Sequence, residues 1–411
     1  MSIQLTAKSL FEVVQDAKIT SPRGFTAAGV HSGVKRKSLD LGAIICAVPA
    51  TAAAVYTTNA FQAPPLKVTQ ESIGVEGKLK AFVVNSGIAN ACTGERGLQD
   101  AYQMRQKTAE LLGIPPHQVG VVSTGVIGEY LPMEKVLNGL ERVVNEAETE
   151  GGELFAKSIL TTDTCTKKVE VSAEIDGKEV KIAGVAKGSG MIHPNMATML
   201  GFVTTDAVID PNHLQSLLWQ TTDETFNMIT VDGDCSTNDM VVAMASGLAG
   251  NHPLHPQHPD WKKFQSAFSY VCQELAKKIA RDGEGATRLI EVKVDGASSV
   301  EMARKIAKSI VGSSLVKSAV FGADANWGRI LCAAGYGDPI ISPDSVDVCL
   351  GPVSVVKGGL PAEYDEAAAS EVLKQEKVEI YVSLNMGEQK ATAWGCDLTY
   401  DYVKINASYR T

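Results

Sequence analysis

Residues 185–200 read VAKGSGMIHPNMATML and follow neither the pattern of a strand nor that of a helix. Gly188 and Gly190 permit backbone conformations that are closed to other residues. The pair His193-Pro194 disfavours continuation of a helix. The small Ala197 then precedes the hydroxyl residue Thr198, and apolar residues follow. The segment therefore predicts a tight turn with an exposed backbone that leads into an apolar segment.

Three interpretations of this turn compete on the residues alone. It is a structural loop, as Gly-rich turns often are. It is a phosphate cradle, because Gly-x-Gly turns present amide N–H groups to anions, although neither the dinucleotide fingerprint nor the P-loop pattern is completed. Or Thr198 is an N-terminal nucleophile. Cleavage before Thr198 would free an α-amine with a pKa near about 8, which gives one residue both a nucleophile and its own base.

On either side of this turn, apolar runs alternate with amphipathic patterns along the whole chain. Val- and Ile-rich runs predict buried strands at Gly42–Val48, Leu79–Val84, Val119–Val122, Val180–Val185, Leu289–Val294 and Val378–Val382. Apolar residues at spacings of three and four predict helices at Leu98–Leu112, Met133–Ala147, His213–Gln220, Trp261–Arg281 and Val300–Ile310. This mixture predicts an α+β fold in which mixed β-sheets are layered with helices.

Charge and composition exclude several classes of protein. The net charge of −9 and the absence of a basic run longer than Lys35–Lys37 argue against nucleic acid as a partner. No apolar window is long enough for a membrane span or an export signal, so we expect no membrane partner and a cytoplasmic location.

His252, His255 and His258 recur in a Pro-rich loop without a thiolate, so no metal site is predicted. Cys235 is interpreted as a packed thiol.

The turn also carries a resemblance to a known family. Residues 187–200 resemble the autoprocessing signature of the ornithine acetyltransferases, the ArgJ proteins. Further matches in register are Ser21–Phe25, Asn85–Gly94 and Asp324–Arg329. The resemblance implies a DmpA/ArgJ-like self-processing fold that cleaves itself between Ala197 and Thr198. An α chain, 1–197, and a β chain, 198–411, would then stay together as one compact catalytic unit.

The same resemblance assigns the residues that would act on substrate. Acyl transfer creates an oxyanion that needs preorganised donors. In the segment Val121–Gly128, Thr124 and Gly125 are similar to the family's oxyanion hole, although Ser-Thr-Gly after a strand is by itself an ordinary turn. The residues similar to the family's substrate contacts are Thr161 (or its neighbour Thr162), Lys187, Thr198, Glu284, Asn406 and Thr411. Lys187 would pair with the α-carboxylate and Glu284 with the ornithine ammonium.

The reaction implied by this resemblance is a ping-pong transfer of acetyl from N2-acetylornithine to glutamate through acetyl-Thr198, without metal or bound cofactor. Acetyl-coenzyme A is expected as a second acetyl donor, which would make the enzyme bifunctional in arginine biosynthesis. An assembly of two α and two β chains is expected. The alternatives are an enzyme with the ornithine activity alone, a self-processing amidase or aminopeptidase that passes its acyl group to water, and an unprocessed binding protein.

Overall fold

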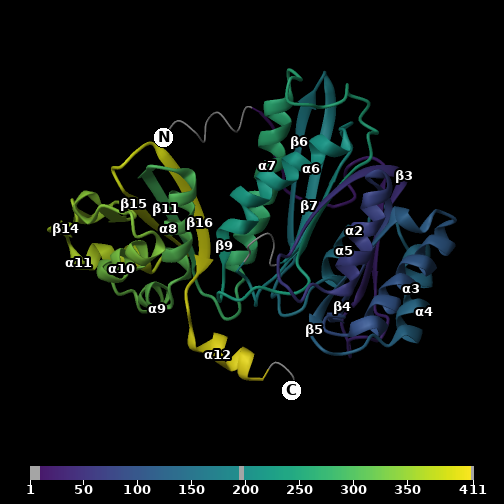
Figure 1. Ribbon diagram of the computed structural model, residues 1–411, viewed down its shortest axis with the longest axis horizontal. Helices are drawn as coiled ribbons and strands as arrows, with labels where there is room; N and C mark the ends of the chain where they lie inside the picture. Colours follow the sequence, from purple (N-terminus) through teal and green to yellow (C-terminus); the bar gives the residue numbers. More distant parts are fainter. Residues whose placement is uncertain (1–9, 194–198, 409–411) are drawn as a thin grey trace. The chain divides into compact units, whose positions relative to one another are not determined.

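The computed structural model describes residues 10–193 and 199–408, and the chain forms two compact units (Figure 1). Unit 1 comprises Met1–Gly188, Asn195–Phe226 and Cys235–Leu275. Unit 2 comprises Ser189–Pro194, Asn227–Asp234 and Ala276–Thr411. Each unit has a β-sheet and helices of its own, so the expectation of mixed sheets layered with helices is confirmed. No helix among the described residues is both long and apolar enough to cross a membrane.

Unit 1 is built on a sheet of nine strands in the order β1-β6-β7-β8-β10-β3-β4-β5, with β2 paired to β3. The strands are β1 (Glu12–Val14), β2 (Phe25–Val30), β3 (Leu41–Tyr56), β4 (Lys78–Ile88), β5 (Val119–Val126), β6 (Lys167–Ile175), β7 (Lys178–Lys187), β8 (Leu200–Thr205) and β10 (Met240–Ala245). Its helices are α2 (Pro64–Glu76), α3 (Gly94–Leu112), α4 (Met133–Asn145), α5 (Gly152–Ser158), α6 (Pro211–Glu224) and the first part of α7 (Trp261–Arg281).

The long strand β3 folds this sheet back on itself. Its first residue, Leu41, lies in one row with Asn85 of β4 and Ser123 of β5, whereas its last residue, Tyr56, pairs with Met240 of β10. A straight strand of this length would separate its two ends by about 50 Å. Yet the side chain of Asn238, just before β10, donates a hydrogen bond to the Ser123 carbonyl. The pairing of β3 with β4 shifts register between Ile45 and Ala50, which is where the strand can bend.

The main core of unit 1 fills the space that this bend creates. Phe82 of β4 packs edge-on against Phe202 of β8, and Phe155 of α5 packs against the same ring. A second apolar cluster lies on the outer side of β4 and β5, where α3 and α4 cover it. Helices α2, α3 and α4 pack against the half of the sheet that ends in β5, and α6 packs against the half that contains β10. Unit 1 is therefore layered: a layer of helices is followed by two layers of strands and then by a second layer of helices.

Unit 2 contains a sheet of seven strands in the order β14-β13-β12-β15-β11-β16-β9. These are β9 (Ile229–Thr230), β11 (Leu289–Ala297), β12 (Asp347–Leu350), β13 (Val353–Lys357), β14 (Leu360–Pro361), β15 (Lys377–Ser383) and β16 (Gln389–Cys396). Its helices, besides the end of α7, are α8 (Val300–Gly312), α9 (Ser314–Gly322), α10 (Trp327–Gly337), α11 (Glu366–Leu373) and α12 (Tyr400–Ala407). Helix α8 packs across β11 and β16.

Every strand and helix named from the sequence pattern is present. Helix α7 has the predicted bounds, and the apolar segment that follows Thr198 is strand β8. The most apolar window of the chain, Ile44–Tyr56, belongs to β3 rather than to a helix. Short elements with weak periodicity, such as α5 and β10, were not predicted.

Candidate functional site

Thr124 and Gly125 lie at the end of β5, where β5 runs parallel to β4. Thr124 is buried. Gly125 has a φ of +133°, and a Cβ on it would lie 2.2 Å from the carbonyl carbon of Gly87, its partner on β4. Only glycine fits such a close approach of two backbones. The backbone at this point is therefore held in one conformation by the neighbouring strand.

Lys187, at the end of β7, reaches the same place from the other half of the sheet. Its Nζ lies 3.4 Å from the Thr124 hydroxyl oxygen, and its side chain is buried. In the strand order, β7 and β5 are separated by four strands, so these two residues meet only because β3 folds the sheet back. The structure thus brings together three of the residues predicted from the sequence: Thr124, Gly125 and Lys187.

Asp163 joins these residues into one network, and sequence reasoning did not assign it a role. Its Oδ1 accepts hydrogen bonds from the Lys167 ammonium at 2.6 Å and from the Gly188 N–H at 2.7 Å, and the side chains of Asp163 and Lys167 are fully buried. Burial alone would raise the pKa of the Asp163 carboxyl. The charges of Lys187 and Lys167 and the two hydrogen bonds outweigh burial and lower this pKa to about 2.

Thr161 lies next to this network, which we call the oxyanion cluster: Thr124, Gly125, Asp163, Lys167 and Lys187. The Thr161 N–H donates to Oδ2 of Asp163 at 3.1 Å, and Thr161 is half-buried. Its neighbour Thr162 is half-buried as well. The choice between these two threonines as a substrate contact stays a prediction.

Lys35 is a further cation close to the cluster, and it is half-buried. Its ammonium donates to the Leu160 carbonyl at 2.6 Å and to the Leu39 carbonyl at 3.1 Å. Its stem packs against Gly87, where a Cβ would lie 3.0 Å from the Lys35 Cγ. Burial lowers the pKa of Lys35 to about 8, with Asp40 opposing and Lys187 adding to the shift. The sequence pattern indicated only a short basic run at this position.

Asn238 and Asp239 were also not predicted. Asn238 is buried and donates to the carbonyl oxygens of Ala89 and Ser123. Asp239 is buried, and its Oδ2 has no hydrogen-bond partner among the described residues. Complete burial raises the pKa of Asp239 well above its usual value, although hydrogen bonds from Ser236 and the charge of Lys187 oppose this shift. Cys235, close by in the sequence, is half-buried with its Sγ 3.7 Å from the Thr57 hydroxyl.

Unit 2 contains a second group, which we call the Glu284 cluster: Ser189, Gly190, Glu284 and Asn406. The Asn406 Nδ2 donates to the Glu284 carboxylate at 2.7 Å, and the Glu284 N–H donates to the Ser189 carbonyl at 3.0 Å. A Cβ on Gly190 would lie 2.4 Å from the Glu284 carboxyl group. The Glu284 carboxylate, which is buried, therefore packs directly on the glycine turn.

The C-terminal segment of the described chain is fastened to this cluster by α12. Thr399 caps the helix, because its hydroxyl accepts the Asp401 N–H, and it donates to the Gly285 carbonyl at 2.7 Å. A Cβ on Gly285 would lie 2.7 Å from the Tyr402 nitrogen, so the helix start lies against the turn that carries Glu284. Of the two predicted tail contacts, Asn406 is thus beside Glu284. Thr411 lies outside the described residues.

The residues before the predicted cleavage point are held by Asp232 of unit 2. The carboxylate oxygens of Asp232 accept the N–H groups of Met191 at 2.7 Å and Ile192 at 2.9 Å. Met191 has a positive φ of 56°, which is uncommon for a residue with a side chain. The His193 ring contacts the Thr230 hydroxyl, and burial lowers the His193 pKa to about 4. Ala197 and Thr198 lie outside the described residues.

The interpretation of Gly188–Gly190 as a phosphate cradle is not supported. The Gly188 N–H already donates to the Asp163 carboxylate, and Gly190 lies against the carboxylate of Glu284. A phosphate would find the Gly188 N–H already engaged, and the Glu284 carboxylate would repel it at Gly190. The turn is instead suited to a cationic group on the side of Glu284.

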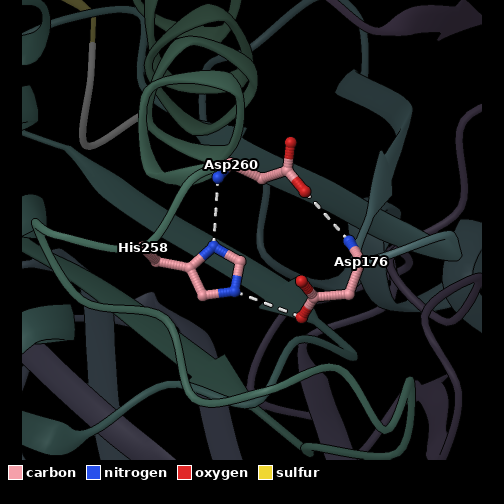
Figure 2. Close-up of side chains that lie close together, drawn as sticks. All are labelled: Asp176, His258 and Asp260. Carbon is pink, nitrogen blue, oxygen red and sulfur yellow. Dashed lines mark hydrogen bonds and ion pairs between the residues drawn. The ribbon is translucent and has the colours of Figure 1, made fainter.

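One group of described residues, Asp176, His258 and Asp260, has the composition of a metal site (Figure 2). Its atoms already bind one another. The His258 Nε2 lies 3.1 Å from Asp176 Oδ2, the Asp260 N–H donates to His258 Nδ1, and the Asp176 N–H donates to Asp260 Oδ2. These bonds join the turn between β6 and β7 to the start of α7. The geometry accounts for the three residues as a structural clamp.

Comparisons with known proteins found a family model, relatives and a solved structure that are similar to this chain. The family model described as "ArgJ family" matches residues 26–411. Two relatives, both named "Arginine biosynthesis bifunctional protein ArgJ", come from Halalkalibacterium halodurans and Geobacillus kaustophilus. The first is 59% identical over 399 residues and the second 59% over 398, and each alignment covers 97% of both chains. A solved structure of ornithine acetyltransferase in complex with ornithine, from Mycobacterium tuberculosis, is 37% identical. It covers 46% of this chain and all of that chain, with a TM-score of 0.43.

The ion pair of Asp163 predicts a specific loss of stability. Asp163→Asn removes the negative charge from a buried ion pair with Lys167, and we expect the free energy of unfolding to fall by about 3–5 kcal/mol. The folded pKa of Asp163 lies below its unfolded value, so its contribution is present above about pH 4 and is lost as the pH falls toward 2. Denaturant unfolding of both proteins from pH 7 to pH 2 measures this.

The matched control for this variant is Glu150→Gln, which breaks an exposed pair with Lys18. We expect the control to leave the unfolding free energy almost unchanged, because exposed ion pairs contribute little. Equal effects of the two variants, or an Asp163→Asn protein with the same pH dependence as the wild type, would contradict the assigned role of the buried pair.

Proposed function

This chain belongs to the ArgJ family, and from that membership we propose that it transfers the acetyl group of N2-acetylornithine to glutamate. The products are ornithine and N-acetylglutamate. The observation that supports this most strongly is the oxyanion cluster. In this cluster the Lys187 ammonium lies beside the hydroxyl of Thr124, which Gly125 follows, although their strands β7 and β5 are distant in the sheet order. Acyl transfer with a substrate that bears a carboxylate requires such a cation close to the oxyanion donors. The name of the relatives, which includes "bifunctional", supports acetyl-coenzyme A as a second donor.

The proposed nucleophile is Thr198, made available by self-cleavage. The Thr198 hydroxyl attacks the carbonyl carbon of Ala197, and its proton passes to the nitrogen as the peptide bond breaks. That break frees the α-amine of Thr198 and leaves Ala197 as an ester on the Thr198 hydroxyl. Water then hydrolyses the ester, which gives the Ala197 carboxylate and the free Thr198 hydroxyl. The clamp of Asp232 on Met191 and Ile192, and the positive φ of Met191, supply an ordered and strained approach to this segment. The α chain, 1–197, and the β chain, 198–411, remain associated, and we propose two copies of each.

In the transfer itself, the Thr198 hydroxyl attacks the acetyl carbonyl while the α-amine accepts the hydroxyl proton. The ornithine nitrogen leaves with that proton, and glutamate reverses the steps. The Thr124 hydroxyl and the Gly125 N–H donate to the oxyanion. No bound metal or cofactor takes part in these steps, and we propose that the enzyme acts in the cytoplasm.

Substrate recognition follows from the charges of the two clusters. In unit 1, the buried cation Lys187 and the half-buried cation Lys35 suit the α-carboxylate of the substrate, with Thr161 close by. In unit 2, the buried carboxylate of Glu284, held by Asn406, suits the ammonium of ornithine. Thr411 is proposed as a further contact of the tail. N2-acetylornithine carries one group of each kind, a carboxylate and an ammonium.

Processing is tested by mass. The purified wild-type protein, once denatured, should separate into two fragments, of which the second begins Thr198-Met199-Leu200. Thr198→Ala should remain one intact chain, because it lacks the attacking hydroxyl. A wild-type protein that is active but intact would refute the N-terminal nucleophile and leave the binding-protein interpretation. Fragments that release acetate but do not acetylate glutamate would favour a self-processing amidase.

The role of Glu284 is tested by comparing donors. Glu284→Gln keeps an oxygen for Asn406 but removes the charge, so we expect the KM for N2-acetylornithine to rise by about 10- to 100-fold. The kcat should change little, and the reaction with acetyl-coenzyme A as donor should be nearly unaffected, since that donor has no ornithine ammonium. Steady-state kinetics with each donor measures this. An equal loss with both donors would contradict the assignment.

A further inference from the structure

The side chain of Asn238 connects two parts of unit 1 that are far apart in the sequence. Its Nδ2 donates to the Ser123 carbonyl at 2.8 Å and to the Ala89 carbonyl at 2.6 Å. Its Oδ1 accepts the Thr237 hydroxyl at 2.6 Å. The side chain is 4% exposed. Both N–H groups and the carbonyl of the amide are therefore engaged, and the group has one orientation.

These bonds fix the backbone that carries the oxyanion donors. The Ser123 carbonyl belongs to the peptide unit that ends in the nitrogen of Thr124, so fixing its direction restrains the backbone from which the Thr124 hydroxyl and the Gly125 N–H project. On the other side of these donors, the Ala89 N–H donates to the Val126 carbonyl at 2.9 Å. Asn238 thus holds the backbone just before Thr124–Gly125, and Ala89 holds it just after.

The same residue is tied to the strand that continues from the proposed nucleophile. Asn238 lies two residues before Met240, the first residue of β10, and β10 runs parallel to β8 with Met240 opposite Leu200. The Met240 N–H donates to the Met199 carbonyl at 2.9 Å, and Met199 is joined directly to Thr198. Between β8 and β5 lie three strands in the sheet order. Asn238 provides a direct link over that separation.

We propose that Asn238 is a positioning residue for acyl transfer. Its carboxamide sets the oxyanion donors Thr124 and Gly125 at a fixed distance from the strand pair β8 and β10. This inference rests on the proposed function. Asn238 binds no substrate, and the charged groups proposed to do so are elsewhere, on Lys187 and Glu284. Its loss should therefore lower kcat and leave KM nearly unchanged, because misplacing a reacting group by about 1 Å costs on the order of 100-fold in rate.

The test compares two buried asparagines. Asn238→Asp keeps the shape but turns both donated bonds into contacts between oxygens. Asn251→Asp is the matched control. Asn251 is also buried in unit 1, and its Nδ2 donates to the carbonyls of Val208 and His252 while its Oδ1 accepts the Val208 N–H. Both variants should melt at a lower temperature than the wild type. Assays at a temperature where all three proteins are folded then separate stability from catalysis.

We expect Asn238→Asp to reduce kcat with N2-acetylornithine and glutamate by about 10- to 100-fold at an unchanged KM. Asn251→Asp should keep the wild-type kcat. If Asn238→Asp stays uncleaved while Asn251→Asp is cleaved, the inference is also supported, since self-cleavage passes through an oxyanion too. Asn238→Ser, which retains one donor, should then be cleaved slowly.

Two outcomes would overturn the inference. One is a wild-type kcat in Asn238→Asp, and the other is an equal fall of kcat in both variants, which would make Asn238 a residue of stability alone. Failure of the proposed function is distinguishable from these. In that case the wild-type protein and the Asn251→Asp control would themselves fail to acetylate glutamate.

Discussion

The bend in strand β3 is the constraint on which the geometry of unit 1 depends. Both ends of this strand must reach the same end of the sheet, because Leu41 is in one row with Ser123 and Tyr56 pairs with Met240. The core residues Phe82 and Phe202 pack edge to face across the folded sheet and stabilise the bend through burial of their rings. The contact of Lys187 with Thr124, and that of Asn238 with Ser123, follow from it.

Burial of charge is the second principle of the arrangement. In unit 1, Asp163 stays ionised in a buried place because two ammonium groups and two N–H donors surround it. In unit 2, Glu284 stays beside a glycine because a Cβ at Gly190 would occupy its place. Each of these two carboxylates holds the loop around it through hydrogen bonds and charge rather than through apolar packing. Under the proposed function, the charges that hold the loops are also those that select an amino acid as substrate.

The sequence predicted the regular elements well because their hydrophobic periodicity is local, as in α7 and the strands β5 and β7. Thr124, Gly125, Lys187 and Glu284 were identified through resemblance to a family, and the structure shows physical reasons for the glycine and for the buried charges. Asp163, Asn238 and Asp239 were missed for another reason. Asn238 is far from its partner Ser123 in the sequence, and only the bend in β3 brings the two together. Asp163 and Asp239 have partners close by in the sequence, Lys167 and Ser236, but nothing in the sequence marks these two carboxylates as buried. No local pattern contains that information.

We propose that acetyl passes through the hydroxyl of Thr198 and that Thr124 and Gly125 donate to the oxyanion. The most direct measurement is to mix the processed enzyme with N2-acetylornithine alone, stop the reaction with acid, and locate the added mass by peptide mapping. We expect one acetyl group on the fragment that begins at Thr198, and its disappearance when glutamate is added. An enzyme that turns over normally but never carries acetyl on this residue, or carries it elsewhere, would contradict the role of Thr198 as nucleophile.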